Sequence, residues 1–391
     1  MARRFSFFSG DKRISVSAII LVIFGSLMIA SAEMGESAGD ASYLTSVIIK
    51  QFIFVVVGLI AYYVLLKMRV YRLRMFLFYA GYLGILFLLI LCRAFGQIGG
   101  AYAWIQIGGG VTLQPSEFGK VFMIAYGAKL FGVDRKDKNI NSFLTFGLCA
   151  LLYFFVIVFI QHDFGTGIVL FVICYCMMLI PNYPQIRKYQ RYMTLLIFVA
   201  LAGMAVLLSD PFTEFLKAHS DNYMVGRFLA AADPFLYQYD NGYHLIMSLV
   251  SFANGGIFGL GYGNSIHKYM NFPNPSNDFI LPVIVEELGI VGFVLFIFVY
   301  GMMLYPLISM SLKTKYLSTK VVTLGVFVYF AVHFILNVGG VSGLVPLTGV
   351  PLLMISSGGS SLMASLASLG LAQSEIERNL KLENENNIGQ V

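Results

Sequence analysis

GYHLIMSLVSFANGGIFGLGYGNSIHKYMNFPNPSNDFILPVIVEELG, residues Gly242 to Gly289, is the stretch around which this sequence is organised. It closes the one long segment between apolar runs, and it enters an apolar helix at Asp278, with Glu286 and Glu287 further along. Charged side chains at this depth of a membrane are costly unless they are paired or used. The stretch therefore predicts a membrane protein with its functional site at the mouth of a helix bundle.

Composition agrees with a membrane location. Hydrophobic residues make up 58% of the 391 residues and charged residues 12%, about half the charged share of a soluble domain. Long continuous apolar runs exclude a barrel, whose strands alternate in polarity over about ten residues. We predict an all-α polytopic membrane protein with about ten transmembrane helices of roughly 20 residues each.

Ten apolar runs carry this prediction. In chain order they are Val16 to Ile29, Ile48 to Leu66, Phe76 to Cys92, Phe118 to Leu130, Phe143 to Phe159, Gly165 to Ile180, Tyr192 to Leu208, Phe279 to Leu307, Val321 to Leu336 and about Pro346 to Leu371. Ala30-Ser31-Ala32 after the first run imitates a signal-peptide cleavage site. We predict a retained span, because the later runs anchor the chain in either case.

Basic residues are concentrated in every second connection. The clusters are Arg3, Arg4, Lys12 and Arg13; Lys67, Arg69, Arg72 and Arg74; Arg135, Lys136 and Lys138; Arg187, Lys188 and Arg191; and Lys313, Lys315 and Lys320. Cytoplasmic loops are rich in Lys and Arg, so both termini are predicted to be cytoplasmic. Residues 1–371 then form one ten-span domain, with an extracytoplasmic loop at about 209–278 between helices 7 and 8, and residues 372–391 form a disordered cytoplasmic tail.

Charge and cysteine patterns exclude other classes. The net charge of +6 is scattered between apolar runs and forms no basic face, so a nucleic-acid partner is not expected. Four cysteines, all inside apolar runs, have no metal-ligand spacing and are predicted to be packing thiols. The glycines from Gly255 to Gly263 follow no strand and end in no GK[ST], which excludes a nucleotide loop; they favour tight turns or a close approach to a lipid or to the backbone of a partner.

Two polar motifs open predicted spans on the outer side. In QPSEFGK, Glu117 and Lys120 lie three residues apart, near one helical face. Either they form a local pair, or Lys120 projects into a polar cavity toward an anionic substrate group. In QHDFGTG, Asp163 either caps the next helix or lines the same cavity.

Asp278 has a simple interpretation as the N-cap of the eighth span, but Pro282 argues against it. Proline fits best at the first helical position, and at position 282 it deletes an amide that would bond back toward Asp278. We therefore place Asp278 on the loop before the regular helix, with Glu286 and Glu287 roughly 12 Å further along. All three carboxylates are candidate site residues.

Further candidates lie in glycine-rich and small-residue segments. Trp104, the only tryptophan, is either a substrate contact or an interfacial anchor. Arg227 is an isolated cation in the long loop, and Ser360 belongs to the run SSGGSS. His333 and Asn337 are four residues apart on one helical face, before a segment rich in glycine and proline that suits a helix break lining a groove.

The chain resembles the SEDS family of bacterial shape, elongation, division and sporulation proteins typified by FtsW, RodA and SpoVE. The motifs that carry the resemblance, in the family's order, are GAYAWIQIGGGVTLQPSEFGK, QHDFGTG, GYHLIMSLVSFANGGIFGLGYGN, NDFILPVIVEELG and NVGGVSGLVPLTGVPLLMISSGGSSL. The chain departs from the family pattern at Ala103, His244, Met247, His267, Asn274, His333 and Ser357. The last motif and the N-terminal start favour the division type over the elongation type.

The resemblance implies a ten-span SEDS fold and peptidoglycan glycosyltransferase activity. The expected substrate is lipid II, polymerised into glycan strands on the outer face of the bacterial cytoplasmic membrane during division or elongation, with the division septum as a candidate location. The motif NDFI implies that Asp278 is catalytic, and Lys120 and Asp163 match polar cavity positions. Expected partners are a class B penicillin-binding protein transpeptidase and other divisome or elongasome membrane proteins.

The chemistry that we predict uses Asp278 as a general base. It takes the proton from the 4-hydroxyl of the acceptor sugar as that oxygen attacks the donor's anomeric carbon and a lipid pyrophosphate leaves. Lys120, Arg227 or a divalent cation, Mg²⁺ or Mn²⁺, would balance the phosphate charge; no organic cofactor is expected. Two alternatives stay open: a lipid II transporter (flippase) and a non-catalytic scaffold for the transpeptidase.

Overall fold

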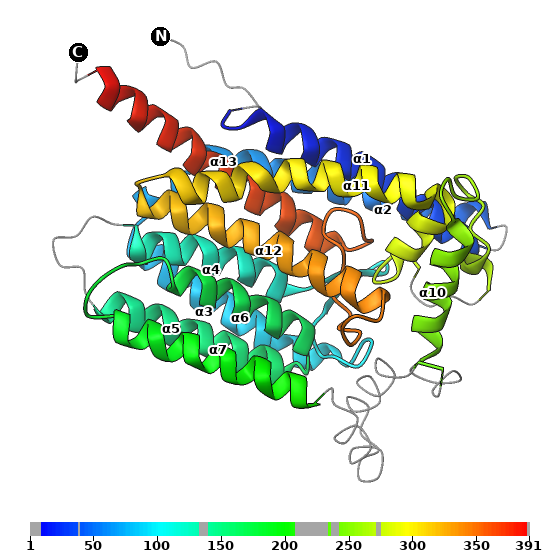
Figure 1. The fold of residues 1–391 in the computed structure, drawn as a ribbon, viewed down its shortest axis with the longest axis horizontal. Helices are drawn as coiled ribbons and strands as arrows, with labels where there is room; N and C mark the ends of the chain where they lie inside the picture. Colours follow the sequence, from blue (N-terminus) through cyan, green and yellow to red (C-terminus); the bar gives the residue numbers. More distant parts are fainter. Residues whose placement is uncertain are drawn as a thin grey trace.

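The computed structural model describes residues 9–37, 40–132, 140–207, 234–235, 242–270 and 275–388. The long helices run side by side along one direction, as the ribbon in Figure 1 shows. Six helical segments are long and apolar enough to cross a membrane: Lys12–Gly35, Ala41–Lys67, Met75–Phe95, Ile140–Ile160, Ile280–Lys313 and Leu317–Val341. The prediction of an all-α multi-pass membrane protein is confirmed, while the count of ten spans stays a prediction.

The helices are α1 (Lys12–Ser37), α2 (Ala41–Lys67), α3 (Met75–Leu91), α4 (Pro115–Phe131), α5 (Ile140–Phe155), α6 (Phe164–Met178), α7 (Arg187–Leu207), α10 (Tyr243–Gly255), α11 (Ile280–Lys313), α12 (Leu317–Val341) and α13 (Gly359–Ile388). Short helical turns are Val70–Arg72, Cys92–Phe95, His267–Tyr269 and the π-helical turn Val156–Ile160. The first nine predicted runs fall on these helices to within a few residues. A hairpin of β1 (Ile105–Gly108) and β2 (Val111–Leu113) adds an element that the sequence prediction lacks.

The last predicted span, about Pro346 to Leu371, is wrong in its first half, which is not helical. Residues 346–358 form a loop of turns and irregular backbone, and α13 begins only at Gly359. Pro346 and Pro351 supply no backbone donor, and Gly349 has a φ of +69°, so a continuous helix cannot form there. An apolar composition alone does not reveal this break.

The prediction of a disordered tail from residue 372 is also wrong for the described part, because α13 continues to Ile388. Ile376 is buried, and the Gln373 amide donates to the Asp11 carbonyl over 2.7 Å and accepts from the Asp11 amide over 2.8 Å. Glu375 accepts hydrogen bonds from Ser318 and Thr319. These polar side chains dock on the bundle, so their polarity is no sign of disorder; residues 389–391 lie outside the described residues.

Helix α13 lies at the centre of the packing. It packs against α2, α4 and α12, whereas α1 and α10 pack against α11. The start of α1 and the end of α13 lie at the same end of the bundle, and α10 lies at the other (Figure 1). We name these the terminal end and the α10 end. Much of the predicted 209–278 loop lies outside the described residues, but its last part carries α10.

Helix α11 is broken at Gly289, which has a φ of +66°. The backbone groups freed by the break bond to the glycine-rich segment 256–261: the Leu260 and Gly261 amides donate to the Glu286 and Glu287 carbonyls, and the Ile290 and Val291 amides donate to the Gly256 and Ile257 carbonyls. A Cβ on Gly255 or Gly259 would stand 2.1 or 2.2 Å from an α11 carbonyl oxygen. These glycines therefore do allow a close approach, but to the backbone of α11 in the same chain and not to the predicted lipid or partner backbone.

Candidate active site

Asp278 lies in a turn directly before α11, whose first residue is Ile280. The N-cap position is Phe279, which forms no side-chain cap, so the prediction that Asp278 precedes the regular helix is confirmed. Its backbone carbonyl accepts a hydrogen bond of 2.9 Å from the Asn337 amide on α12. The side chain is partly exposed, and its Oδ2 lies 3.5 Å from where a Cβ on Gly349 would stand.

The loop of residues 346–358 holds this turn from a second side. Ser356 Oγ donates to the Asn277 carbonyl over 2.8 Å, and the Ser357 amide donates to the Ser276 carbonyl over 2.7 Å. The same Asn337 amide that bonds Asp278 also donates to the Val350 carbonyl over 3.0 Å. The position of Asp278 is thus set by hydrogen bonds that two other parts of the chain donate to the backbone carbonyls of its turn.

Lys120 is fully buried and takes part in a polar network within the bundle. Its Nζ donates to Glu117 Oε1 over 2.7 Å and lies 2.9 Å from His333 Nε2. Nδ1 of His333 lies 3.1 Å from the Pro351 carbonyl, which can only accept, so Nδ1 carries the proton and Nε2 accepts from Lys120. The Tyr329 hydroxyl donates to Glu117 over 2.9 Å.

The predicted local pair of Lys120 with Glu117 is confirmed. The ammonium also contacts His333, which in turn holds the loop beside Asp278. A buried ion pair needs such additional hydrogen bonds to offset desolvation. The predicted contact of Lys120 with an anionic substrate group stays a prediction.

Asp163 caps α6, because its Oδ1 accepts from the Thr166 amide over 3.0 Å. Its Oδ2 accepts from the Gln114 side chain over 3.1 Å, and the Gln114 backbone amide donates to Ser360 Oγ over 2.9 Å. Desolvation raises the pKa of Asp163 above its ordinary value, against the lowering effect of the Thr166 hydrogen bond. The cap interpretation of Asp163 is thus confirmed, and its second oxygen belongs to a polar cluster with Gln114 and Ser360; that it lines a cavity with Lys120 stays a prediction.

The cap of α6 and the Asp278 turn meet at the same loop. A Cβ on Gly165 would stand 2.5 Å from the Thr348 carbonyl oxygen, and Gly349, next in the chain, lies beside Asp278. Two buried side-chain oxygens in this region, Asn337 Oδ1 and Thr348 Oγ1, have no hydrogen-bond partner among the described residues. Unsatisfied buried acceptors and hydroxyls are costly, so a polar ligand or water would be stabilised here.

Glu286 and Glu287 are fully buried and lie away from this cluster, against the loop that follows α10. Glu286 accepts from His267 Nδ1 over 2.7 Å. Glu287 accepts from Lys268 Nζ over 2.8 Å and from Ser31 on α1 over 2.6 Å. Both carboxylates are hydrogen-bonded within the fold, Glu287 to an ammonium and Glu286 to an imidazole, and their predicted substrate contact stays a prediction.

The remaining candidates are less defined. Trp104 is partly buried and directly precedes β1. Arg227 lies outside the described residues. The described residues contain no group of three or more His, Cys, Asp or Glu side chains placed to bind a metal ion.

Sequence reasoning missed Gln114 in the Asp163 cluster and Tyr329 in the Lys120 network. Gln114 stands at the N-cap of α4, before Pro115; its side-chain amide donates to Asp163 and its backbone amide donates to Ser360. Tyr329 lies four residues before His333 and contacts Glu117. The four-residue spacing was a usable signal, because it places both side chains on one face of α12.

Comparison with known proteins is consistent across sequence and structure. The family model FTSW_RODA_SPOVE, described as "Cell cycle protein", matches residues 12–381. A Bacillus subtilis protein named "Probable peptidoglycan glycosyltransferase FtsW" is 32% identical, over 93% of this chain and 89% of its own. "Stage V sporulation protein E" of the same organism is 30% identical, over 93% of this chain and 96% of its own.

Solved structures show the same fold. A structure titled "Structural coordination of polymerization and crosslinking by a peptidoglycan synthase complex" matches with a TM-score of 0.71 at 23% identity, over 95% of this chain and 98% of that chain. The crystal structure of the rod shape determining protein RodA from Thermus thermophilus matches with a TM-score of 0.65 at 23% identity, over 95% and 98% of the two chains.

Proposed function

Because this chain belongs to the FtsW/RodA/SpoVE family of cell cycle proteins, we propose that it polymerises lipid II into glycan strands on the outer face of the cytoplasmic membrane. The chain is a multi-pass membrane peptidoglycan glycosyltransferase. One observation carries the finer proposal: Asp278, a partly exposed residue, lies on a turn that α12 and the 346–358 loop hold in place.

In this proposal Asp278 is the general base. The carboxylate accepts the proton of the acceptor sugar's 4-hydroxyl as the oxygen bonds to the donor's anomeric carbon, and the bond from that carbon to the lipid pyrophosphate breaks. A positioned base contributes about 10²- to 10⁴-fold to such a rate. Hydrogen bonds from Asn337 and Ser356 to carbonyls of the turn hold Asp278 in a defined position, which suits a group that must meet a substrate.

The other candidate residues have distinct proposed roles. Asp163, Gln114 and Ser360 offer acceptors and donors for the substrate's hydroxyl and amide groups. Lys120 is a positioning residue, since its ammonium reaches the loop beside Asp278 only through His333. Arg227 remains a proposed partner of the phosphates.

A divalent cation, Mg²⁺ or Mn²⁺, is also proposed. Mg²⁺ usually binds through one or two carboxylates together with substrate phosphates, so Asp278 and the lipid pyrophosphate are a sufficient set without a protein cage. The cation would supply positive charge to the departing phosphates. Chelation with EDTA and addition of Mg²⁺ or Mn²⁺ in a polymerisation assay tests this.

We also propose a class B penicillin-binding protein transpeptidase as the partner, together with other divisome or elongasome membrane proteins. The similar fold within a peptidoglycan synthase complex supports this. Both termini lie on the cytoplasmic side in this proposal, in accord with the alternation of basic connections, and the division septum is the proposed location.

The deciding experiment is lipid II polymerisation by the purified protein, alone and with its transpeptidase, comparing wild type with Asp278→Asn. Glycan strands from wild type alone support Asp278 as the base. Equal polymer from both variants would contradict it. Absence of polymer from both, even with the partner present, would favour the transporter or the scaffold.

The transporter has one observation in its favour, the break in α11, since broken helices form binding sites in many transporters. Here the freed groups are bonded to residues 256–261 and offer no open ligands. The glycosyltransferase therefore remains the better supported function.

A further inference from the structure

A cavity of about 310 Å³ lies at the terminal end of the bundle, away from Asp278. Its wall includes Phe131, the last residue of α4, whereas Gln114 at the other end of that helix belongs to the polar cluster. A helix of 17 residues is about 25 Å long. The cavity is therefore separate from the candidate active site.

The cavity is strongly cationic. Lys315, Lys320 and Arg378 line it, and no carboxylate does. Arg378 pairs with Glu375 over 3.2 Å, while the two lysines form no ion pair with any residue that the structure describes. A concave surface with uncompensated positive charge concentrates anions.

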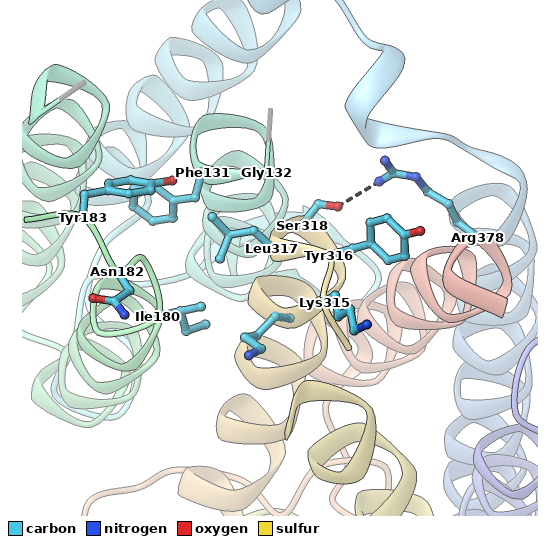
Figure 2. A pocket seen from close by; sticks show the side chains of 11 residues that line it. Phe131, Gly132, Ile180, Asn182, Tyr183, Lys315, Tyr316, Leu317, Ser318 and Arg378 are labelled. Atoms are coloured by element: carbon cyan, nitrogen blue, oxygen red, sulfur yellow. Dashed lines mark hydrogen bonds between the residues drawn. The ribbon is translucent and has the colours of Figure 1, made fainter. Parts of the chain in front are cut away.

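Part of this charge is held in a fixed orientation. Arg378 NH1 donates to Ser318 Oγ over 2.8 Å, and Ser318 in turn donates to Glu375 over 3.2 Å. Figure 2 shows Arg378 across the cavity from Asn182 and Tyr183, with the bond to Ser318 dashed. A guanidinium fixed in this way is preorganised for a phosphate, which it can bind through two parallel hydrogen bonds.

The wall is also partly apolar. Phe131, Ile180 and Leu317 line the same cavity. A free inorganic anion gains nothing from apolar neighbours, whereas a lipid places its glycerol and acyl carbons beside them. Basic pockets between transmembrane helices are known to take anionic head groups.

We propose that this cavity binds the phosphate head group of an anionic membrane lipid, with Lys315, Lys320 and Arg378 as its ligands. The plainer explanation is that these lysines only fix topology. Lys313 separates the two explanations: it belongs to the same basic connection, is exposed and does not line the cavity. If the lysines only fix topology, replacing Lys313 or Lys315 has the same effect. If the cavity binds a lipid, only the replacement of Lys315 weakens that binding.

The test uses the full chain in a neutral detergent. Its thermal unfolding temperature is measured with phosphatidylglycerol, phosphatidylcholine or inorganic phosphate, for wild type, Lys315→Gln/Lys320→Gln and the control Lys313→Gln. We expect phosphatidylglycerol to raise the unfolding temperature of wild type and of the control equally, and the double variant to keep less than half of that shift. The lipid-induced shift is compared within each variant, so a change in basal stability does not obscure it.

Three outcomes would overturn the proposal. The double variant and wild type show equal shifts, or phosphatidylcholine acts as well as phosphatidylglycerol, or inorganic phosphate gives the full shift. The last result would assign the cavity to a soluble phosphate compound. Native mass spectrometry of the same samples counts retained phosphatidylglycerol and is expected to follow the same order.

Discussion

Asp278 and the pair Glu286 and Glu287 lie within ten residues of one another, yet the fold treats them in opposite ways. Asp278 is held through its backbone and keeps a partly exposed side chain. The two glutamates are fully buried and their carboxylates are consumed by His267, Lys268 and Ser31. The comparison shows that a carboxylate's role depends on what its oxygens contact, and that proximity along the sequence does not decide it.

The largest expected effect is on catalysis at Asp278. Asp278→Asn keeps size and backbone contacts but removes the base, so polymerisation is expected to fall by about 10²- to 10⁴-fold with little change in unfolding temperature. Glu286→Gln is the matched control, because it makes the same chemical change eight positions later. If Glu286→Gln lost as much activity without loss of stability, the contrast between the two regions would be refuted.

Protein stability, unlike polymerisation activity, is expected to depend more on the buried Glu287 than on Asp278. Glu287→Gln leaves Lys268 buried without a countercharge, and breaking a buried ion pair in this way costs about 3–5 kcal/mol. Thermal or denaturant unfolding in detergent measures the loss. The double variant Lys268→Met/Glu287→Gln removes both charges and is expected to recover most of it; no recovery would mean that the pair is not the source of the stability.

A smaller effect is expected at Asn337. Asn337→Ala removes the two hydrogen bonds to the Asp278 and Val350 carbonyls and leaves them unsatisfied, a cost of about 1–3 kcal/mol each. As a positioning residue, Asn337 should affect turnover more than apparent substrate affinity, and Asn337→Asp or →Gln should not restore the geometry. The ratio of kcat to KM effects in the polymerisation assay checks this, and unchanged turnover would exclude the positioning role.

The smallest expected effect concerns pH. Burial raises the pKa of Asp163 above 3.8, so the folded protein holds this proton at pH values where the unfolded chain has released it. The contribution of Asp163 to stability is therefore full below pH 3.8 and declines as pH rises through the folded pKa. Asp163→Asn retains a capping side chain and removes this dependence, so its unfolding temperature relative to wild type should rise with pH; a constant difference would contradict the shift.

The sequence allowed us to predict the backbone position of Asp278 but not all side-chain contacts of Lys120. Pro282 was enough to place Asp278 before the helix, because proline's missing amide is a local constraint. The partners of Lys120 were not readable in full: Glu117 is three residues away, but His333 is 213 residues away. Local spacing named one contact of the network and could not name the one that links it to the Asp278 loop.

The departures from the family pattern show the same limit. His267 and His333 have no evident role in the linear sequence, yet each contacts a charged side chain, Glu286 or Lys120, in the fold. For the C-terminal tail the prediction failed in another way. Its polar composition is typical of a disordered segment, but Gln373 and Glu375 form hydrogen bonds with residues of the bundle.

The sequence by itself determined that this chain is a bundle of membrane helices, because hydrocarbon admits only long apolar segments with internally bonded backbones. It also placed Asp278 before the regular helix, since proline acts locally, whereas the break at Gly289 and the extent of the 346–358 loop appeared only in the structure. Only the tertiary structure decided that Glu286 and Glu287 are buried against His267, Lys268 and Ser31. Those contacts join three separate segments of the chain, and a buried charge without such partners is too costly to keep.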